Sequence, residues 1–312
     1  MKKYLTSIQD LTRQEIEYLF EVALTMKGSK GHLTDILKGK SVGLVFQKPS
    51  NRTRVSFEVA IWQLGGNCIY LGPEEIKLGE RETTADVAKT LSRYLDGIVA
   101  RTHSHQDVLD LAKYATVPVV NGLSDLFHPC QALADLLTVK EKLNRLKVDR
   151  IKEVTLAYVG DGNNVCHSLM IGAAKLGLRM NIATPKGYEP KKEVVNIARS
   201  LAEQSEAQIH ITNVPQDAVR GAHVIYTDVW TSMGQEAETQ QRLTDFKEFQ
   251  IDKNLTLLAH RDFLFMHCLP AHRGEEVTDE IIDGPHSVVF DQAENRLHIQ
   301  KAILIQLLGE LV

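Results

Sequence analysis

The residues with the clearest potential for chemistry form a short polar segment, Ser50-Asn51-Arg52-Thr53-Arg54, directly after an apolar run. The pattern of residues 55–62 then predicts a helix. Backbone N–H groups at a helix start, the hydroxyls of Ser50 and Thr53 and the guanidinium of Arg52 would together bind a dianion. This segment therefore favours a phosphate ester or anhydride as ligand. The other interpretation is a capped helix start with two solvated arginines.

Three more polar clusters follow apolar, strand-like runs. They are Phe127-His128-Pro129-Cys130-Gln131, Asp228-Val229-Trp230-Thr231-Ser232-Met233-Gly234 and Met266-His267-Cys268-Leu269-Pro270-Ala271-His272-Arg273-Gly274. Catalytic groups of open α/β sheets lie at the ends of strands, so this placement indicates chemistry. Taken alone, each cluster also has a structural explanation, since His128 can donate to a carbonyl, Cys268 can be a small core residue and Asp228 can cap a helix.

These clusters must be positioned by regular elements, and strand-like runs alternate with helix-like segments through most of the chain. The predicted strands are residues 41–46, 67–71, 97–100, 117–121, 154–159, 179–184, 209–212, 224–228, 264–267 and 288–290. The predicted helices include residues 83–94, 131–146, 168–176, 191–204 and 295–311. The expected fold class is α/β, with two domains, each a parallel β-sheet flanked by helices, joined by two interdomain helices.

A chain of 312 residues is long for one compact core, which is the first reason to expect two domains. We predict a first domain of residues 1–145, completed by a C-terminal helix at 293–312, and a second domain of residues 146–292. The helix at 131–146 would leave the first domain, and the last helix would return to it. The ligand site is expected in the cleft between the domains, where the carboxyl ends of parallel strands converge.

The composition limits the class of protein. Hydrophobic residues make up 43% and charged residues 24%, as in ordinary soluble globular proteins. The net charge is −4 and the basic residues form no stripe, which argues against nucleic acid as a partner. No apolar run approaches the ~20 residues of a membrane span, and no signal peptide is evident. The cysteines are far apart and form no Cys-x-x-Cys pair, so we expect reduced thiols in a cytoplasm.

The four clusters in this order resemble the ornithine branch of the aspartate/ornithine carbamoyltransferase family, and the similarity spans essentially the whole chain. The motifs shared with the family are Ser50-x-Arg52-Thr53-Arg54, His128-Pro129-x-Gln131 and His267-Cys268-Leu269-Pro270. Those typical of the ornithine branch are Asp228-x-x-x-Ser232-Met233-Gly234, Asn121-Gly122-Leu123-Ser124-Asp125, Gly160-Asp161-Gly162-Asn163-Asn164 and Glu294-Asn295-Arg296. The resemblance implies transfer of the carbamoyl group from carbamoyl phosphate to the δ-amine of L-ornithine, giving L-citrulline and phosphate, without cofactor or metal. It leaves open whether the reaction serves arginine biosynthesis or arginine catabolism.

The resemblance also implies a role for individual residues. The first domain would bind carbamoyl phosphate and the second L-ornithine. Carbamoyl phosphate would be bound by Ser50, Asn51, Arg52, Thr53, Lys77, Arg101, His128, Gln131, Cys268, Leu269 and Arg296. L-Ornithine would be bound by Asn164, Asp228, Ser232 and Met233. The implied catalytic residues are Arg52, Arg101, His128 and Cys268, and no covalent intermediate on the thiol is required.

Two positions depart from the family pattern. Asn51 stands where the family usually has threonine, which is tolerable if the residue contributes mainly its backbone N–H. Lys77 stands where relatives carry glutamine or histidine that reaches a neighbouring subunit's site. The lysine would either meet the phosphate as a charge or lie on the surface. The resemblance further implies a homotrimer, or a multiple of trimers, with each site at a subunit junction.

Other classes of function remain as alternatives. A nicotinamide-dependent oxidoreductase is suggested by the glycine-rich turn at 160–164, although Val165 replaces the third glycine and no acidic residue ends the next strand. A zinc hydrolase would use His267, Cys268 and His272, all from one loop without a carboxylate at recognised spacing. A catalytically silent binding protein is the third, although every polar position that the chemistry requires is filled. Putrescine or N-acetylornithine could replace ornithine, although the residues at 228–234 favour a free α-amino acid head.

Overall fold

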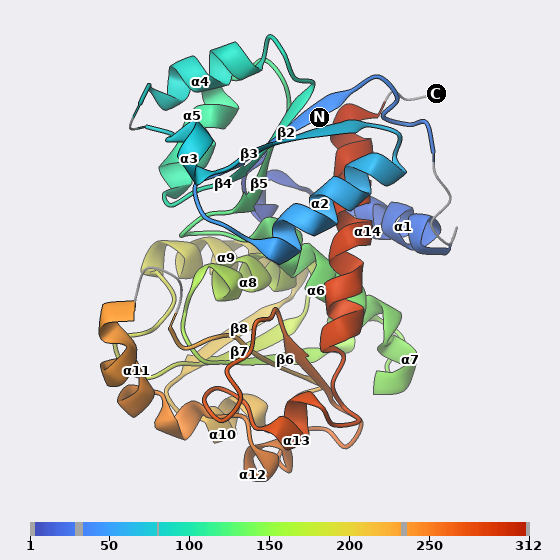
Figure 1. The fold of residues 1–312 in the computed structure, drawn as a ribbon. Coiled ribbons are helices and arrows are strands. Elements are labelled where there is room, and N and C mark those ends of the chain that lie inside the picture. Colours follow the sequence, from blue (N-terminus) through green and yellow to red (C-terminus); the bar gives the residue numbers. More distant parts are fainter. Residues whose placement is uncertain (1–3, 29–33, 80, 232–235, 310–312) are drawn as a thin grey trace. The chain divides into compact units, whose positions relative to one another are not determined.

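The structure is a computed structural model that describes residues 4–28, 34–79, 81–231 and 236–309. The chain divides into two compact units. Unit 1 comprises Met1–Ala134 and Glu294–Val312, and unit 2 comprises Asp135–Ala293. Each unit contains one five-stranded parallel sheet with helices packed against it (Figure 1). The predicted fold class is therefore confirmed.

The sheet of unit 1 has the strand order β1-β5-β4-β2-β3, and all its neighbouring strands are parallel. Its strands are β1 (Tyr4–Leu5), β2 (Ser41–Phe46), β3 (Asn67–Leu71), β4 (Gly97–Arg101) and β5 (Val119–Leu123). β4 is buried along its whole length, and so is β2 after its first residue. Helices cover both faces of such strands, which explains why both read as continuous apolar runs in the sequence.

The helices of unit 1 lie on both faces of its sheet. They are η1 (Ile8–Asp10), α1 (Arg13–Gly28), α2 (Asn51–Gln63), α3 (Pro73–Ile76), α4 (Thr84–Leu91), α5 (His105–Tyr114), the start of α6 (Pro129–Glu141) and most of α14 (Val289–Leu308). On one face, Val87 of α4 and Val108 of α5 share a buried cluster with Ile98 of β4. Figure 1 shows α2 on the other side of this sheet.

Unit 2 repeats this architecture with the strand order β10-β9-β6-β7-β8, again parallel throughout. Its strands are β6 (Thr155–Val159), β7 (Arg179–Ala183), β8 (Gln208–Thr212), β9 (Val224–Thr227) and β10 (Leu264–His267). Its further elements are α7 (Leu143–Leu146), η2 (Ile151–Glu153), α8 (Asn164–Leu176), α9 (Lys192–Ser205), α10 (Pro215–Val219), η3 (Glu236–Glu238), α11 (Thr239–Asp245), η4 (Lys247–Phe249), α12 (Lys253–Thr256) and α13 (Asp279–Ile282). A buried aromatic cluster that includes Trp230, Phe246 and Phe249 packs on one face of the sheet.

Two helices belong to both units. The division between the units falls inside α6, at 134/135, and inside α14, at 293/294. The sequence predicted domain boundaries at 145/146 and 292/293. A carbamoyl phosphate-binding domain and an ornithine-binding domain with those boundaries stay a prediction. The helix expected at 131–146 is interrupted, since Lys142 adopts φ −100° and ψ 9° between α6 and α7.

The predicted strand at 288–290 was wrong. Val289 and Phe290 begin α14 and Val288 directly precedes it; Val288 and Val289 are both buried, and Phe290 is 75% exposed. Two adjacent buried residues fit a helix start, whereas a strand would place residues 288 and 290 on the same face. The other predicted strands are present, with ends shifted by two residues at most. β1 is an additional strand that was not predicted, and it pairs with β5.

No helix within the described ranges combines the length and apolar character that crossing a membrane would require.

Candidate functional site

A buried cluster of positive charge surrounds Thr53 in unit 1. The hydroxyl Oγ1 of Thr53 accepts hydrogen bonds from Arg296 Nη2 at 2.8 Å and from Arg101 Nη1 at 3.5 Å. None of the three side chains exceeds 5% exposure. They come from the first turn of α2, the end of β4 and α14. The fold therefore brings together residues that lie up to 243 positions apart in the sequence.

The start of α2 adds backbone donors to unit 1. Ser50 is the N-cap, with extended backbone, and its Oγ accepts the N–H of Thr53 at 3.3 Å. Asn51 and Arg52 are exposed in the same turn. The positive end of this 13-residue helix and the guanidinium of Arg52 can both attract an anion. These features fit the dianion site expected from the sequence.

A local irregularity in the sheet accompanies Arg101. The register between β4 and β5 shifts between Ala100 and Arg101, and such bulges re-aim side chains beside functional sites. Gly122 lies opposite, where a Cβ would be 3.2 Å from the carbonyl oxygen of Ala100. The glycine thus permits the close approach of the two strands at the point where Arg101 leaves the sheet.

His128 follows a tightly bonded turn. Asn121 Nδ2 donates to the carbonyl oxygen of Thr6 at 2.9 Å and to Ser124 Oγ at 3.3 Å, while Ser124 N donates to the carbonyl oxygen of Phe127 at 2.9 Å. The motif at 121–125 thus has a structural role. It fixes the turn that delivers the buried His128 to the start of α6.

Burial and like charge set the protonation of this cluster. Burial, followed by the charges of Arg296 and Arg52, lowers the pKa of Arg101 to about 10. Burial, followed by Arg296 and Arg101, holds the pKa of His128 well below its ordinary value. At neutral pH the imidazole is therefore uncharged while Arg101 keeps its charge. Within the part of the chain that the structure describes, the buried Nε of Arg101 has no hydrogen-bond partner. An anion would supply that partner.

Two further residues predicted for carbamoyl phosphate occupy different environments in unit 1. Gln131 is 1% exposed in the first turn of α6. Lys77 is exposed at the C-cap of α3, with Nζ 4.0 Å from Glu74 Oε2. The phosphate role of Lys77 stays a prediction, and this placement matches the alternative of a surface lysine.

The polar cluster of unit 2 is centred on Asp228, which is 5% exposed after β9. Its Oδ1 accepts from the Sγ of Cys268 at 2.9 Å and from the backbone N–H of Val229 at 2.8 Å. Its Oδ2 accepts from Asn163 Nδ2 at 2.8 Å. The structure therefore brings together Asp228 and Cys268, which were predicted, and Asn163, which was not.

Asn163 also caps α8. Its Oδ1 accepts the backbone N–H groups of Val165 at 3.0 Å and Cys166 at 3.1 Å. The predicted ligand residue Asn164 is the first residue of the helix and is partly buried. Because the cap occupies helix-start donors that a pyrophosphate would need, this geometry argues against the dinucleotide alternative. Gly162 has a packing role instead, since a Cβ there would be 2.6 Å from the carbonyl carbon of Glu189.

The zinc alternative requires His267 and His272 to lie at one common site, and the structure does not place them at one. Ligand atoms of Asp228, His267 and Cys268 lie within 4.8 Å of one another, and those of His272, Glu275 and Glu276 form a second such group. Both ring nitrogens of His267 already have protein partners, Leu269 N and Glu276 Oε1. The two histidines fall into separate groups, so the three-ligand set proposed from the sequence is not assembled among the described residues.

Arg242 is a residue that sequence reasoning missed. Its Nη1 donates to the carbonyl oxygen of Trp230 at 2.9 Å and to Asp161 Oδ2 at 3.2 Å, and its Nε donates to Glu238 Oε2 at 2.9 Å. In the sequence, Trp230 and Glu238 stand on either side of Ser232 and Met233, the predicted ornithine ligands, which lie outside the described residues. Burial raises the pKa of Asp161 to about 6 against the opposing charge of Arg242. No motif marks Arg242, because its three partners are dispersed along the sequence.

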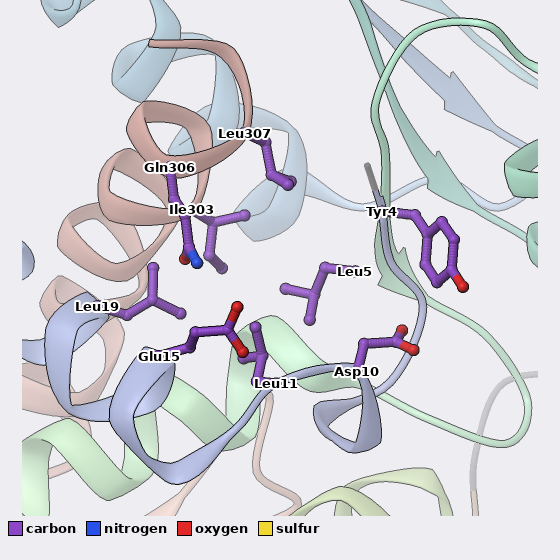
Figure 2. A pocket seen from close by; sticks show the side chains of 9 residues that line it. All are labelled: Tyr4, Leu5, Asp10, Leu11, Glu15, Leu19, Ile303, Gln306 and Leu307. Carbon is purple, nitrogen blue, oxygen red and sulfur yellow. The ribbon is translucent and has the colours of Figure 1, made fainter. Parts of the chain in front are cut away.

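A separate pocket in unit 1 lies between β1, α1 and α14 (Figure 2). Its lining is largely apolar and consists of Tyr4, Leu5, Asp10, Leu11, Glu15, Leu19, Ile303, Gln306 and Leu307. None of the residues predicted to do chemistry contributes to it, so we do not assign it to the candidate site.

The fold and the two clusters define a class of protein: an α/β enzyme with an anion-binding unit and a unit whose carboxylate can hold an amine. Residues 3–141 match the carbamoyl-P binding domain of aspartate/ornithine carbamoyltransferases. Residues 152–307 match the Asp/Orn binding domain of the same proteins. The chain therefore belongs to the aspartate/ornithine carbamoyltransferase family.

Similar proteins cover nearly the whole chain. The ornithine carbamoyltransferase of Thermococcus kodakarensis is 54% identical over 304 residues, which are 97% of this chain and 95% of the relative. The anabolic ornithine carbamoyltransferase of Pyrococcus furiosus is 54% identical over 309 residues, 98% of this chain and 96% of the relative. A solved structure of ornithine carbamoyltransferase from Pyrococcus furiosus has a TM-score of 0.94 at 52% identity, with coverage of 100% of this chain and 98% of the other.

Proposed function

We propose that this chain transfers the carbamoyl group of carbamoyl phosphate to the δ-amine of L-ornithine, giving L-citrulline and phosphate. The observation that carries this proposal is the 54% identity, over 97% of the chain, to a protein named ornithine carbamoyltransferase. The Pyrococcus furiosus relative is named anabolic, so we place the reaction in arginine biosynthesis. The carbonyl carbon of carbamoyl phosphate is already activated, because phosphate is a good leaving group. The proposed reaction therefore needs no cofactor.

The first step is binding of the phosphate by unit 1. Arg52 and the start of α2, with its cap at Ser50, would hold the dianion and stabilise phosphate as it departs. The backbone N–H of Asn51 belongs to the same turn. Support comes from the exposure of Arg52 at a helix start and from the positive charge that already surrounds Thr53.

The second step is stabilisation of the charge that develops on the carbonyl oxygen. Thr53, Arg101 and His128 would donate to this oxygen, with Arg296 beside it and Gln131 at the carbamoyl amide. A neutral imidazole can donate one hydrogen bond without adding to the repulsion among the guanidinium groups. The lowered pKa of His128 supports this role.

The third step is presentation of the acceptor by unit 2. Asp228 would hold the α-ammonium group of ornithine, with Asn164, Ser232 and Met233 as further ligands. Cys268 and Leu269 would adjust the position of the δ-amine. The amine must attack in its neutral form, and because an alkyl ammonium titrates near ~10, desolvation beside positive charge would favour that form.

An assay of the ureido group, which citrulline and the carbamoylated forms of the other two amines share, tests the proposal. The purified chain is supplied with carbamoyl phosphate, and its turnover is measured with L-ornithine, with putrescine and with N-acetylornithine as acceptor. We expect turnover with ornithine, because the two other amines lack the free α-amino acid head. Faster turnover with putrescine or N-acetylornithine would overturn the proposed acceptor, and no citrulline from ornithine would overturn the reaction. An Arg101→Ala preparation is the control for contaminating host enzyme.

We also propose a homotrimer, or a multiple of it, located in the cytoplasm. Val55 and Trp62, two turns apart on α2, are 55% and 62% exposed, as expected for an apolar face that a neighbouring copy covers. No disulfide joins the cysteines, which fits a reducing compartment. Light scattering should give three times, or a multiple of three times, the 34.9 kDa mass of one chain. A monomer at micromolar concentration would exclude this assembly.

A further inference from the structure

His267, at the end of β10, has a protein partner on each ring nitrogen, and its side chain is fully buried. The backbone N–H of Leu269 donates to Nδ1 at 2.9 Å. Because Nδ1 accepts this bond it cannot carry a proton, so the proton of the neutral ring must be on Nε2. Nε2 lies 3.2 Å from Glu276 Oε1, which can accept that proton's hydrogen bond. The contacts therefore select one tautomer of His267.

Glu276 closes the loop that follows His267. Its carboxylate is fully buried, and Oε1 also accepts the backbone N–H of His272 at 2.5 Å. One buried carboxylate thus bonds to the residue that begins the loop and to a residue five positions later. A buried carboxylate is costly unless it is hydrogen-bonded, so these two bonds are needed to keep it there.

The turn between these anchors has an unusual backbone. Leu269 has φ +58°, in the left-handed region that residues other than glycine rarely adopt. Its N–H is the group that His267 Nδ1 accepts. Cys268, one residue earlier, places Sγ 2.9 Å from Asp228 Oδ1. Any change in the bond to Nδ1 would therefore move both Cys268 and Leu269, the two residues of this loop expected at the acceptor amine.

We propose that His267 and Glu276 are positioning residues for the acceptor: Glu276 fixes the Nε2–H tautomer of His267, and His267 Nδ1 thereby holds the Cys268–Leu269 turn. This inference rests on the proposed function, because that function places Cys268 and Leu269 at the reacting amine. Neither His267 nor Glu276 touches a substrate. The other tautomer would set an N–H of the ring against the N–H of Leu269 and release the turn.

A matched pair of substitutions separates the two ring nitrogens. His267→Asn places a carbonyl oxygen near the position of Nδ1, so it keeps an acceptor for Leu269. His267→Gln places an amide nitrogen near the position of Nε2, so it keeps a donor for Glu276. With saturating carbamoyl phosphate, we expect kcat/KM for ornithine to fall about 10-fold in the first and about 100-fold or more in the second. Equal losses, or a larger loss in His267→Asn, would overturn the inference.

His223 provides the matched control. Its Nδ1 also accepts a backbone N–H, that of Thr155 at 3.1 Å, but it precedes β9 rather than following a strand at the site. His223→Gln removes the same kind of bond, and kcat/KM for ornithine should stay within about 2-fold of wild type. A loss comparable to that of His267→Gln would show that any such bond has the same effect, which contradicts a positioning role.

Glu276 gives a second test that does not depend on the folding of the His267 variants. Glu276→Gln keeps an acceptor oxygen and should retain ornithine kcat/KM within about 5-fold, whereas Glu276→Leu should lose about 10-fold or more. Retention of full ornithine use by Glu276→Leu would overturn the inference. The tautomer itself is read in wild type by ¹H–¹⁵N NMR of histidine-labelled protein, where a proton on Nδ1 would refute it. If wild type forms no citrulline, the proposed function fails, while the NMR result still decides the tautomer.

Discussion

The cluster in unit 1 and the cluster in unit 2 differ in how completely their polar groups are paired. In unit 1, burial lowers the pKa of Arg101, and the neighbouring positive charges of Arg296 and Arg52 lower it further. In unit 2, both oxygens of Asp228 accept hydrogen bonds from neighbouring donors. The first cluster therefore stores repulsion that an anion relieves, whereas the second is already satisfied and must exchange a partner for the ligand.

The largest effect on activity is expected from removing Arg101, at the centre of the positively charged cluster in unit 1. Arg101→Ala removes a buried guanidinium that would donate to the reacting oxygen, and kcat should fall by about 10³-fold, roughly 4 kcal/mol. The measurement is the rate of citrulline formation at saturating substrates. Arg93→Ala, which removes an exposed arginine from the same unit, is the control for net charge. Activity of Arg101→Ala within 10-fold of wild type would remove this arginine from the chemistry.

The next effect separates two arginines of one motif. Arg52→Ala should lose about 3 kcal/mol of transition-state stabilisation through lost contact with the phosphate. Arg54 is the matched control, because its guanidinium is 2.8 Å from Glu58 Oε1 and 3.8 Å from the centre of the Tyr70 ring. We expect Arg54→Ala to change kcat/KM for carbamoyl phosphate only a few-fold. Equal losses in the two variants would show that the motif acts through general charge.

A pH-dependent effect on stability is expected from unit 2. Burial raises the pKa of Asp161 to about 6, so the folded protein binds this proton more tightly than the unfolded chain does. Its contribution to the free energy of unfolding should therefore grow as the pH falls from 7 through 6, and be complete below about 4. The free energy of unfolding is measured with urea for wild type and for Asp161→Asn. The wild-type value minus the variant's value should rise by about 2–3 kcal/mol over this pH range.

The control for that measurement is Asp149→Asn, which removes an exposed carboxylate. Its difference from wild type should stay nearly constant between pH 7 and pH 4. A difference for Asp161→Asn that falls with decreasing pH would mean that Arg242 outweighs burial.

The smallest effect concerns the satisfied cluster. Cys268→Ala removes one of the donors to Asp228, and the KM for ornithine should rise about 10-fold, while carbamoyl-phosphate binding changes less. Steady-state kinetics with each substrate varied in turn measure the split. Complete loss of activity together with an isolable carbamoyl-enzyme would instead show covalent catalysis, and would contradict a positioning role for the thiol.

The sequence predicted most of the sheets because buried parallel strands are short apolar runs bounded by turn residues. Residues 41–46, 67–71 and 264–267 are strands with the predicted ends. Residues 288–290 have the same apolar character, yet they lie at the start of a helix, which buries apolar side chains as well as a strand does. Local composition cannot distinguish these outcomes, because the choice depends on which tertiary surface the residues meet.

The candidate site was predictable where motifs mark it and not where distant residues support it. The polar segment at 50–54 pointed to Thr53, whereas only the resemblance led to Arg101 and Arg296, and the structure places these three together. Asn163 lay inside a recognised motif, but its bond to Asp228 spans 65 positions. Arg242 reaches Asp161 across 81 positions, so neither spacing nor composition indicates the contact.

Gly162 has a consequence for which changes the acceptor cluster can tolerate. Even one added methyl group there would meet the main chain at Glu189 and Pro190, which has no flexible end to swing aside. The strain would pass to the adjacent Asn163, and from its amide to Asp228. A residue that contributes no functional group thus restricts which substitutions the acceptor cluster can accept.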